Sequence, residues 1–178
     1  AMTLGRLGRN VGLQTWLAHD ERGEIIEDHF TASHVVITEE SFGADHTPTA
    51  LAKLNEEGAA TYTFDLDWCP PCPIWVSTQA RIVHSGSIAA VIEPGAHAVL
   101  DAMVTARQHA IITYDPNARP ALMGTPEQAL ATVNKFIGIS DVVKVSDEDI
   151  AWLTNGREID EVVRDWLTAG PSLIVVTK

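Results

Sequence analysis

The sequence has 178 residues, of which 46% are hydrophobic, so it can bury one sizeable core and is predicted to be one domain or a large piece of one. Its 24 acidic and 12 basic residues give a formal charge of -12, which repels phosphate backbones and anionic membrane surfaces and argues against nucleic-acid or membrane partners. Two cysteines, no bilayer-length apolar run and no basic region followed by an apolar core at the N-terminus make the cytoplasm the expected compartment.

The N-terminal part of the chain alternates helix and strand signals before its period changes. Residues 1–8 are typical of the last turns of a helix closed by a glycine, without a cap ahead of them. A strand is predicted at 11–17, and a helix with acidic residues in its first turn at 20–30. Between residues 48 and 68 the period shifts towards two, and the turn at 55–58 predicts a β-hairpin.

From residue 81 onward, strands and helices alternate. This order predicts a parallel sheet with helices on its faces, because right-handed crossovers of helical length connect parallel neighbours. Parallel strands are normally buried on both faces, so the last strand is expected to need further sequence to cover it. The predicted strands are 81–87, 110–115, 141–145 and 172–177, and the predicted helices are 93–109, 125–137 and two that begin at Ser146 and Glu158.

The stretch IITYDPNARPALM, residues 111–123, contains the most informative motif. A buried strand ends in Asp115, a proline turns the chain, and Asn117 and Arg119 follow at the carboxyl end of the strand. In open α/β sheets the ligand crevice lies outside such ends. An amide and a guanidinium there could orient a metal-bound water and a phosphate or sugar hydroxyl. The alternative is an ordinary turn in which Asp115 and Asn117 cap the backbone.

A second motif is DVVKVSDEDIAWLT, residues 141–154, which predicts a short strand followed at once by a helix. Ser146 stands at the N-cap position, and Asp149 three residues later is the acid of a capping box. That structural role accounts for both residues. The functional alternative is that Asp149 also points into a nucleotide crevice and holds a water of hydrated magnesium, which prefers carboxylate oxygen and keeps several waters.

A competing signal is WCPPC, residues 68–72, which looks like the thioredoxin redox motif. That chemistry needs the first cysteine at a helix N-terminus, where the dipole activates the thiol. Pro73 follows directly and no amphipathic helix begins nearby, so a stiff polyproline-like exit from the hairpin is the alternative. A zinc site would need two further ligands, and the nearest histidine, His84, lies in a predicted strand.

Taken in order, these segments resemble the ribokinase-like (pfkB-type) carbohydrate kinases, and within them the fructokinase-type sugar kinases. The resemblance runs over nearly the whole chain, and DPNxRP and KVSDED are its specific parts. It implies an α/β, ribokinase-like sandwich with a mostly parallel sheet flanked by helices, in which residues 48–68 form a small β-hairpin lid. It also implies that residues 1–178 are the central part of one such domain, incomplete at both ends.

The activity that the resemblance implies is transfer of the γ-phosphate of ATP to a hydroxyl of a small sugar, such as fructose or ribose, with Mg²⁺ as the metal ion. A small sugar and ATP are then the expected partners, and a homodimer through the lid is a further expectation. The site residues that it implies are Phe64, Asn117 and Arg119 for the sugar, Lys144, Ser146 and Thr177 for the nucleotide, and Asp149 for magnesium through a water.

The sequence departs from the family pattern in three places. The Asn-x-x-Glu magnesium motif is here Ser146-Asp147-Glu148-Asp149, whose last carboxylate reaches about one methylene less far. The sugar-holding N-terminal residues would precede Ala1, and the segment with the catalytic base would follow Lys178. No catalytic base is therefore expected within the chain, which alone should be inactive. The alternatives are a thiol-disulfide oxidoreductase that uses Cys69 and Cys72, and a catalytically silent binding domain on the kinase fold.

Overall fold

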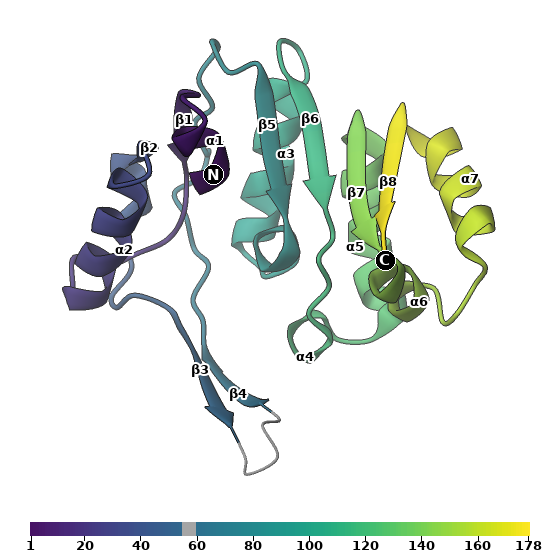
Figure 1. The fold of residues 1–178 in the computed structure, drawn as a ribbon, viewed down its shortest axis with the longest axis horizontal. Coiled ribbons are helices and arrows are strands. Elements are labelled where there is room, and N and C mark those ends of the chain that lie inside the picture. Colours follow the sequence, from purple (N-terminus) through teal and green to yellow (C-terminus); the bar gives the residue numbers. More distant parts are fainter. Residues whose placement is uncertain (55–59) are drawn as a thin grey trace. The chain divides into compact units, whose positions relative to one another are not determined.

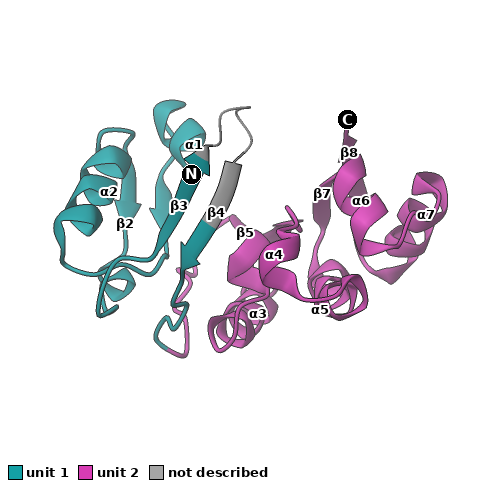
Figure 2. Ribbon diagram, turned by 90° about the horizontal axis from the view of Figure 1, so that it is seen from below, with its two compact units in different colours: residues 1–71 teal, residues 72–178 magenta. Residues whose placement is uncertain are grey.

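The computed structural model of this protein describes residues 1–54 and 60–178, without the side chains of residues 54–62. The chain divides into two compact units, Ala1–Pro71 and Cys72–Lys178 (Figure 2). In the part of the chain that the structure describes, no helix combines the length and the apolar character needed to cross a lipid bilayer.

The first unit contains a pair of parallel strands and an antiparallel hairpin (Figure 1). Two of its strands, β1 and β2, pair in parallel and are joined by the helix α2, whose N-cap is Asp20. In chain order its elements are α1 (Met2–Arg6), β1 (Val11–Leu13), α2 (Glu21–Thr31), β2 (Val35–Ile37), the 3-10 helix η1 (Glu39–Ser41), β3 (Thr49–Leu54) and β4 (Ala60–Asp65).

The hairpin predicted at residues 48–68 is confirmed. Its strands β3 and β4 pair antiparallel, with Thr49 opposite Asp65 and Leu54 opposite Ala60. The predicted turn at 55–58 lies outside the described residues. The prediction of a helix end closed by a glycine is also confirmed, because Gly8 follows α1 with a left-handed φ of 74°.

The second unit is a four-stranded parallel sheet, of order β5-β6-β7-β8, with helices between its strands (Figure 1). It confirms the predicted α/β class with a mostly parallel sheet. In chain order its elements are β5 (Ile82–Gly86), the 3-10 helix η2 (Ser87–Ala90), α3 (Gly95–Ala106), β6 (Ile111–Asp115), α4 (Pro120–Met123), α5 (Pro126–Ile139), β7 (Val142–Ser146), α6 (Asp147–Leu153), α7 (Ile159–Ala169) and β8 (Leu173–Thr177).

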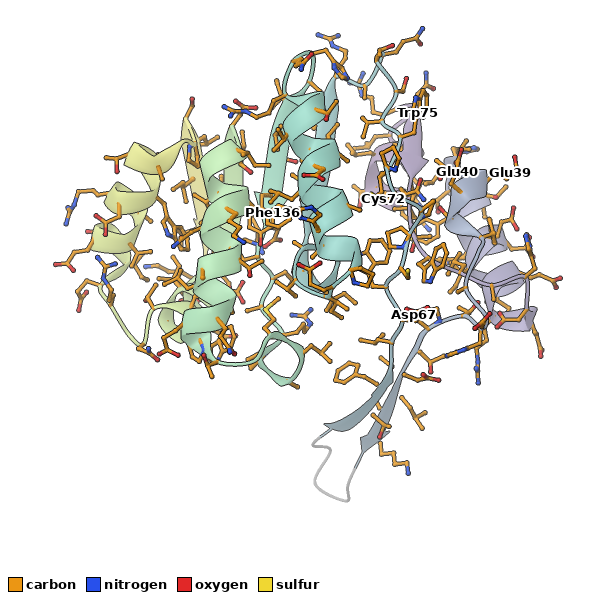
Figure 3. The ribbon with its side chains drawn as sticks, turned by 180° about the vertical axis from the view of Figure 1, so that it is seen from behind. Glu39, Glu40, Asp67, Cys72, Trp75 and Phe136 are labelled. Atoms are coloured by element: carbon orange, nitrogen blue, oxygen red, sulfur yellow. The ribbon has the colours of Figure 1, made fainter. Side chains whose placement is uncertain are left out.

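The core of the second unit lies between its sheet and the helices α3 and α5, which cover one face of the sheet (Figure 1, Figure 3). Alternate residues of a strand point to the same face, so every second residue of β6 and β7 is buried. The ring of Phe136 on α5 stacks on Tyr114 of β6, with the ring centroids 5.1 Å apart. The buried strand residues on this face are Ile112, Tyr114, Val143 and Val145.

Three local features differ from the sequence prediction. The strand predicted at 11–17 is limited to β1, Val11–Leu13, and Leu17 instead makes an isolated bridge with Phe42. No strand was predicted at Val35–Ile37, where β2 pairs with β1. The short helix α4, Pro120–Met123, was not predicted from the sequence.

Candidate functional site

The predicted functional residues of the second unit lie at the carboxyl ends of its parallel strands. Gly86 at the end of β5 pairs in register with Asp115 at the end of β6. Ser146 at the end of β7 likewise pairs with Thr177 at the end of β8. All four strands therefore end at one edge of the sheet, which is where open α/β sheets bind their ligands.

The loop after β6 folds back on itself. Asn117 has a left-handed φ of 37°, and its amide N–H donates to Asp115 Oδ1 over 3.2 Å. Arg119 Nη1 donates to Asn117 Oδ1 at 3.1 Å and to the carbonyl oxygen of Ala118 at 2.8 Å. Arg119 occupies one of the two lone pairs of the Asn117 side-chain oxygen, and the side-chain nitrogen Nδ2 of Asn117 is a donor that could bind a ligand.

The end of β5 supports this loop from the neighbouring strand. Ser87 Oγ donates to the carbonyl oxygen of Asn117 over 3.0 Å. Gly86 lies so close to β6 that a Cβ there would collide with the carbonyl oxygen of Asp115. Neither role was predicted from the sequence, although the glycine in RIVHSGS stands directly at a strand end, where a close backbone approach is a known reason for glycine.

Lys144 and Asp115 form an ion pair at the same edge. Lys144 Nζ lies 3.2 Å from Asp115 Oδ2, with 43% of the lysine side chain and 23% of the aspartate side chain exposed. An ion pair this exposed adds little stability. The pair does place the ammonium of Lys144 beside the loop that contains Arg119, in a chain whose formal charge is -12. Arg119 and Lys144 are the cations that an anionic ligand would meet at this edge, beside the carboxylates of Asp115 and Asp149.

The start of α6 confirms the predicted capping box. Ser146 Oγ accepts the Asp149 amide N–H at 3.0 Å, and Asp149 Oδ2 accepts the Ser146 amide N–H at 3.4 Å. The other oxygen of Asp149, Oδ1, accepts the amide N–H of Ala118 at 2.9 Å. This second contact joins the two motifs that the sequence singled out.

The described residues do not form a protein cage for a metal ion. Among them, no group of three or more His, Cys, Asp or Glu side chains gathers closely enough to hold one. Each oxygen of the Asp149 carboxylate already accepts a backbone N–H. The contact of Asp149 with magnesium through a water stays a prediction.

Thr177 and Phe64 occupy different units. Thr177 is exposed at the end of β8, on the edge described above. Phe64 lies on β4 of the first unit, opposite Ala50 in the hairpin. Their roles towards nucleotide and sugar stay predictions.

The cysteine pair lacks the structure that thioredoxin-type chemistry requires. Cys69 and Cys72 are both exposed and neither forms a disulfide. Residues 66–81, which include Cys72 and Trp75 of Figure 3, contain no helix. The helix N-terminus on which that chemistry depends is therefore missing from this segment.

A shallow pocket of about 370 Å³ lies between α6 and the start of α7, and its lining includes Asp147 and Glu148, which stand between the predicted site residues Ser146 and Asp149. Acidic side chains dominate its lining, which disfavours an anionic ligand. Its lining residues are Asp147, Glu148, Ala151, Gly156, Arg157, Glu158 and Ile159.

Comparison with known proteins finds sugar kinases. No family model matches the chain. A fructokinase from Rhizobium leguminosarum bv. trifolii is 30% identical over an alignment of 187 positions, which covers 100% of this chain and 56% of that protein. Probable fructokinase-4 from Arabidopsis thaliana is 28% identical over 90% of this chain and 52% of its own length. The chain thus spans about half the length of the curated relatives it matches.

Solved structures show the same fold. The apo form of a fructokinase from Vibrio cholerae O395 matches with a TM-score of 0.82 and 23% identity, over 100% of this chain and 64% of that one. A fructokinase from Xylella fastidiosa gives a TM-score of 0.83 at 22% identity, over 99% and 61%. The Vibrio enzyme in its fructose, ADP and calcium ion bound form gives 0.81 at 23% identity, over 100% and 60%. The predicted ribokinase-like fold is confirmed.

Proposed function

We propose that the chain belongs to the ribokinase-like (pfkB-type) carbohydrate kinase family, and that the protein carrying it transfers the γ-phosphate of ATP to a hydroxyl of a small sugar, with fructose as the first choice. The fructokinase from Rhizobium leguminosarum, which aligns over the whole chain, supports the sugar. The Vibrio fructokinase with fructose and ADP bound supports the same pair of ligands.

The observation that carries the proposal is the gathering of Asn117, Arg119 and Lys144 at one edge of the sheet. Phosphoryl transfer leaves little covalent chemistry to the protein, so positioning and charge stabilisation dominate. The guanidinium of Arg119 and the ammonium of Lys144 are cations that can bind phosphate oxygens. The side-chain nitrogen Nδ2 of Asn117 is a donor suited to an oxygen of the sugar or of the transferred phosphoryl group.

The nucleotide side of the proposed site consists of Lys144, Ser146 and Thr177, at the ends of β7 and β8. These strands are neighbours, and Ser146 pairs in register with Thr177. Magnesium bound to the nucleotide would neutralise charge on the β- and γ-phosphate oxygens. We propose that this magnesium ion is held chiefly by the phosphates and by water, and that Asp149 contacts it through one of those waters.

The hairpin of β3 and β4 is proposed as a lid over the sugar, with Phe64 as a sugar-facing side chain. Closure of such a lid excludes water, which otherwise competes as phosphoryl acceptor. A homodimer formed through the hairpin and a cytoplasmic location complete the proposal. We further propose that these 178 residues form the central part of one kinase domain, and that the catalytic base lies outside them.

A coupled ADP-release assay on the full-length protein, over a panel of small sugars, tests the proposal. Magnesium-dependent turnover that requires fructose or another sugar is the expected result. Ligand binding without ADP release would support a catalytically silent binding domain instead. Redox cycling of Cys69 and Cys72 without phosphoryl transfer would support an oxidoreductase. The 178-residue chain in the same assay should release no ADP.

A further inference from the structure

The carboxylate of Asp149 binds two separate backbone segments. Its Oδ1 accepts the amide N–H of Ala118 at 2.9 Å, and its Oδ2 accepts that of Ser146 at 3.4 Å. Ala118 lies 31 residues earlier in the chain, in the loop after β6. One side chain therefore connects the start of α6 with the loop that contains Asn117 and Arg119.

The contact with Ala118 satisfies a backbone group that has left solvent. Ala118 is 8% exposed, and a buried N–H without an acceptor costs free energy comparable to a lost hydrogen bond. The loop is also held in an uncommon conformation, since Asn117 has a left-handed φ of 37°. Such a conformation persists where neighbouring contacts fix it.

The contacts around the loop come from three strand ends. Ser87, after β5, donates to the carbonyl oxygen of Asn117 over 3.0 Å. Asp115, at the end of β6, accepts the amide N–H of Asn117 over 3.2 Å. Asp149, after β7, accepts the next amide, that of Ala118. Of these three residues, Asp149 alone belongs to the nucleotide side of the proposed site. It contacts the loop itself, whereas Lys144 of that side pairs with Asp115, where the loop begins.

We propose that Asp149 is a positioning residue, which fixes the Asn117–Arg119 loop against the N-terminal end of α6 and so sets the distance between the sugar side and the nucleotide side. Its catalytic consequence depends on the proposed kinase function, whereas its geometric role does not. The departure from Asn-x-x-Glu fits this role, because the short side chain of aspartate keeps its carboxylate at the cap, within reach of the Ala118 amide.

Amide hydrogen exchange of the ¹⁵N-labelled 178-residue chain tests the geometric role. In Asp149→Ala the Ala118 amide should exchange about tenfold faster, the loss expected for one hydrogen bond to a charged acceptor. Asp149→Asn keeps one acceptor oxygen and should restore part of the protection, and this variant serves where the alanine variant does not fold. Thr125→Ala, which removes the capping box of α5, is the matched control and should leave Ala118 unchanged.

The magnesium dependence of the full-length protein separates positioning from metal binding. A positioning role predicts that Asp149→Asn lowers kcat/KM while the magnesium concentration for half-maximal activity rises by much less than tenfold, as expected for a contact made only through water. An increase in that concentration of tenfold or more, with the Ala118 amide exchanging as in the wild type, would overturn the inference. A full-length protein without sugar kinase activity would refute the proposed function alone, because the exchange experiment would still report on Asp149.

Discussion

Arg119 has a guanidinium that is fixed by its own loop and still exposed. Nη1 is committed to the oxygens of Asn117 and Ala118, which orients the planar group before any ligand arrives. The remaining N–H groups of the guanidinium are then free to bind phosphate or hydroxyl oxygens. A residue that was predicted from its place in DPNxRP is therefore held in a conformation suited to binding.

Arg119→Ala in the full-length protein should lower kcat/KM by about ten- to a hundredfold, because a hydrogen bond to a charged group is worth about 1.5 to 3 kcal/mol. Steady-state kinetics with the preferred sugar measures the change. Arg107→Ala, an exposed arginine at the end of α3, is the control and should change neither constant. Unchanged kinetics with a lower Tm in Arg119→Ala would reduce the residue to a turn-forming role.

Tyr114 buries a hydroxyl that finds no hydrogen-bond partner among the described residues. Burial, followed by the nearby charges of Asp115 and Asp149, raises the pKa of this phenol well above its usual range. Tyr114→Phe keeps the ring on Phe136 and removes an unsatisfied polar atom, so stability should rise by about 0 to 1 kcal/mol. Thermal unfolding measures this, with Phe136→Ala, which should cost about 3 to 5 kcal/mol, as the comparison. A loss of more than about 1 kcal/mol in Tyr114→Phe would reveal a partner for the hydroxyl.

Asp20 joins the start of α2 to the segment before the hairpin. The side-chain hydroxyl and the amide of Thr47, together with the amide of Gly23, donate to its carboxylate and lower its pKa to about 2 from 3.8. Because the folded pKa is the lower one, the contribution to stability is complete above pH 3.8 and is lost as the pH falls through about 2.

Asp20→Asn should therefore lower Tm at neutral pH, and its difference from the wild type should shrink as the pH falls from about 4 towards 2. Thermal unfolding monitored by circular dichroism over this pH series provides the measurement. Asp28→Asn, an exposed change within the same helix, is the control and should show no such trend. A Tm difference between Asp20→Asn and the wild type that stays constant with pH would contradict the assigned contacts.

The sequence brought Asn117, Arg119 and Asp149 to one edge because each follows a strand of the same parallel sheet, and parallel strands end together. It could not show which atoms these residues bind. Ser87 binds the carbonyl oxygen of Asn117 from a neighbouring strand, and Ala118 binds Asp149 through its backbone N–H. Neither a side-chain type nor a spacing in the sequence marks such a contact.

The elements that the sequence predicted well are long and strongly patterned. The helix predicted at 125–137 matches α5, Pro126–Ile139, which has a capping box from Thr125 and a proline in its first turn. The strand β2 was missed because three residues, Val35–Ile37, give too short a run to show a period. Its pairing with β1 depends on α2 returning the chain, which is a tertiary effect.

The approach of β5 to β6 makes Gly86 a test of the sheet edge. Gly86→Ala should destabilise the chain by about 1 to 3 kcal/mol, since the added methyl would collide with the backbone of Asp115 and displace the strand end. Denaturant unfolding gives the free energy. Gly12→Ala, in β1, is the matched control, because nothing lies within 4 Å of a Cβ at that position. Equal stability of the two variants would contradict the close approach.

The sheet of the second unit presents two different faces. Ile112 and Tyr114 point towards α3 and α5 and are buried, whereas Ile111, on the same strand, points the other way and is 50% exposed. Exposed apolar residues also occur at Ile82, Leu173 and Val175, each of which is followed by a half-buried residue in its strand. A parallel sheet is normally covered on both faces, so the face with these exposed residues is expected to bind apolar surface of other molecules.

The 178-residue chain should therefore self-associate in a concentration-dependent manner, through the face that carries Ile82 and Ile111. These two residues are partners in register, so Ile82→Thr with Ile111→Thr replaces one exposed apolar pair by polar residues that still favour a strand. Light scattering coupled to size exclusion should show less association in this double variant, with an unchanged Tm. Ile112→Thr, which alters the buried face instead, should lower Tm and leave association no weaker. A wild-type chain that stays monomeric at all concentrations would show that the exposed face is not a site of association.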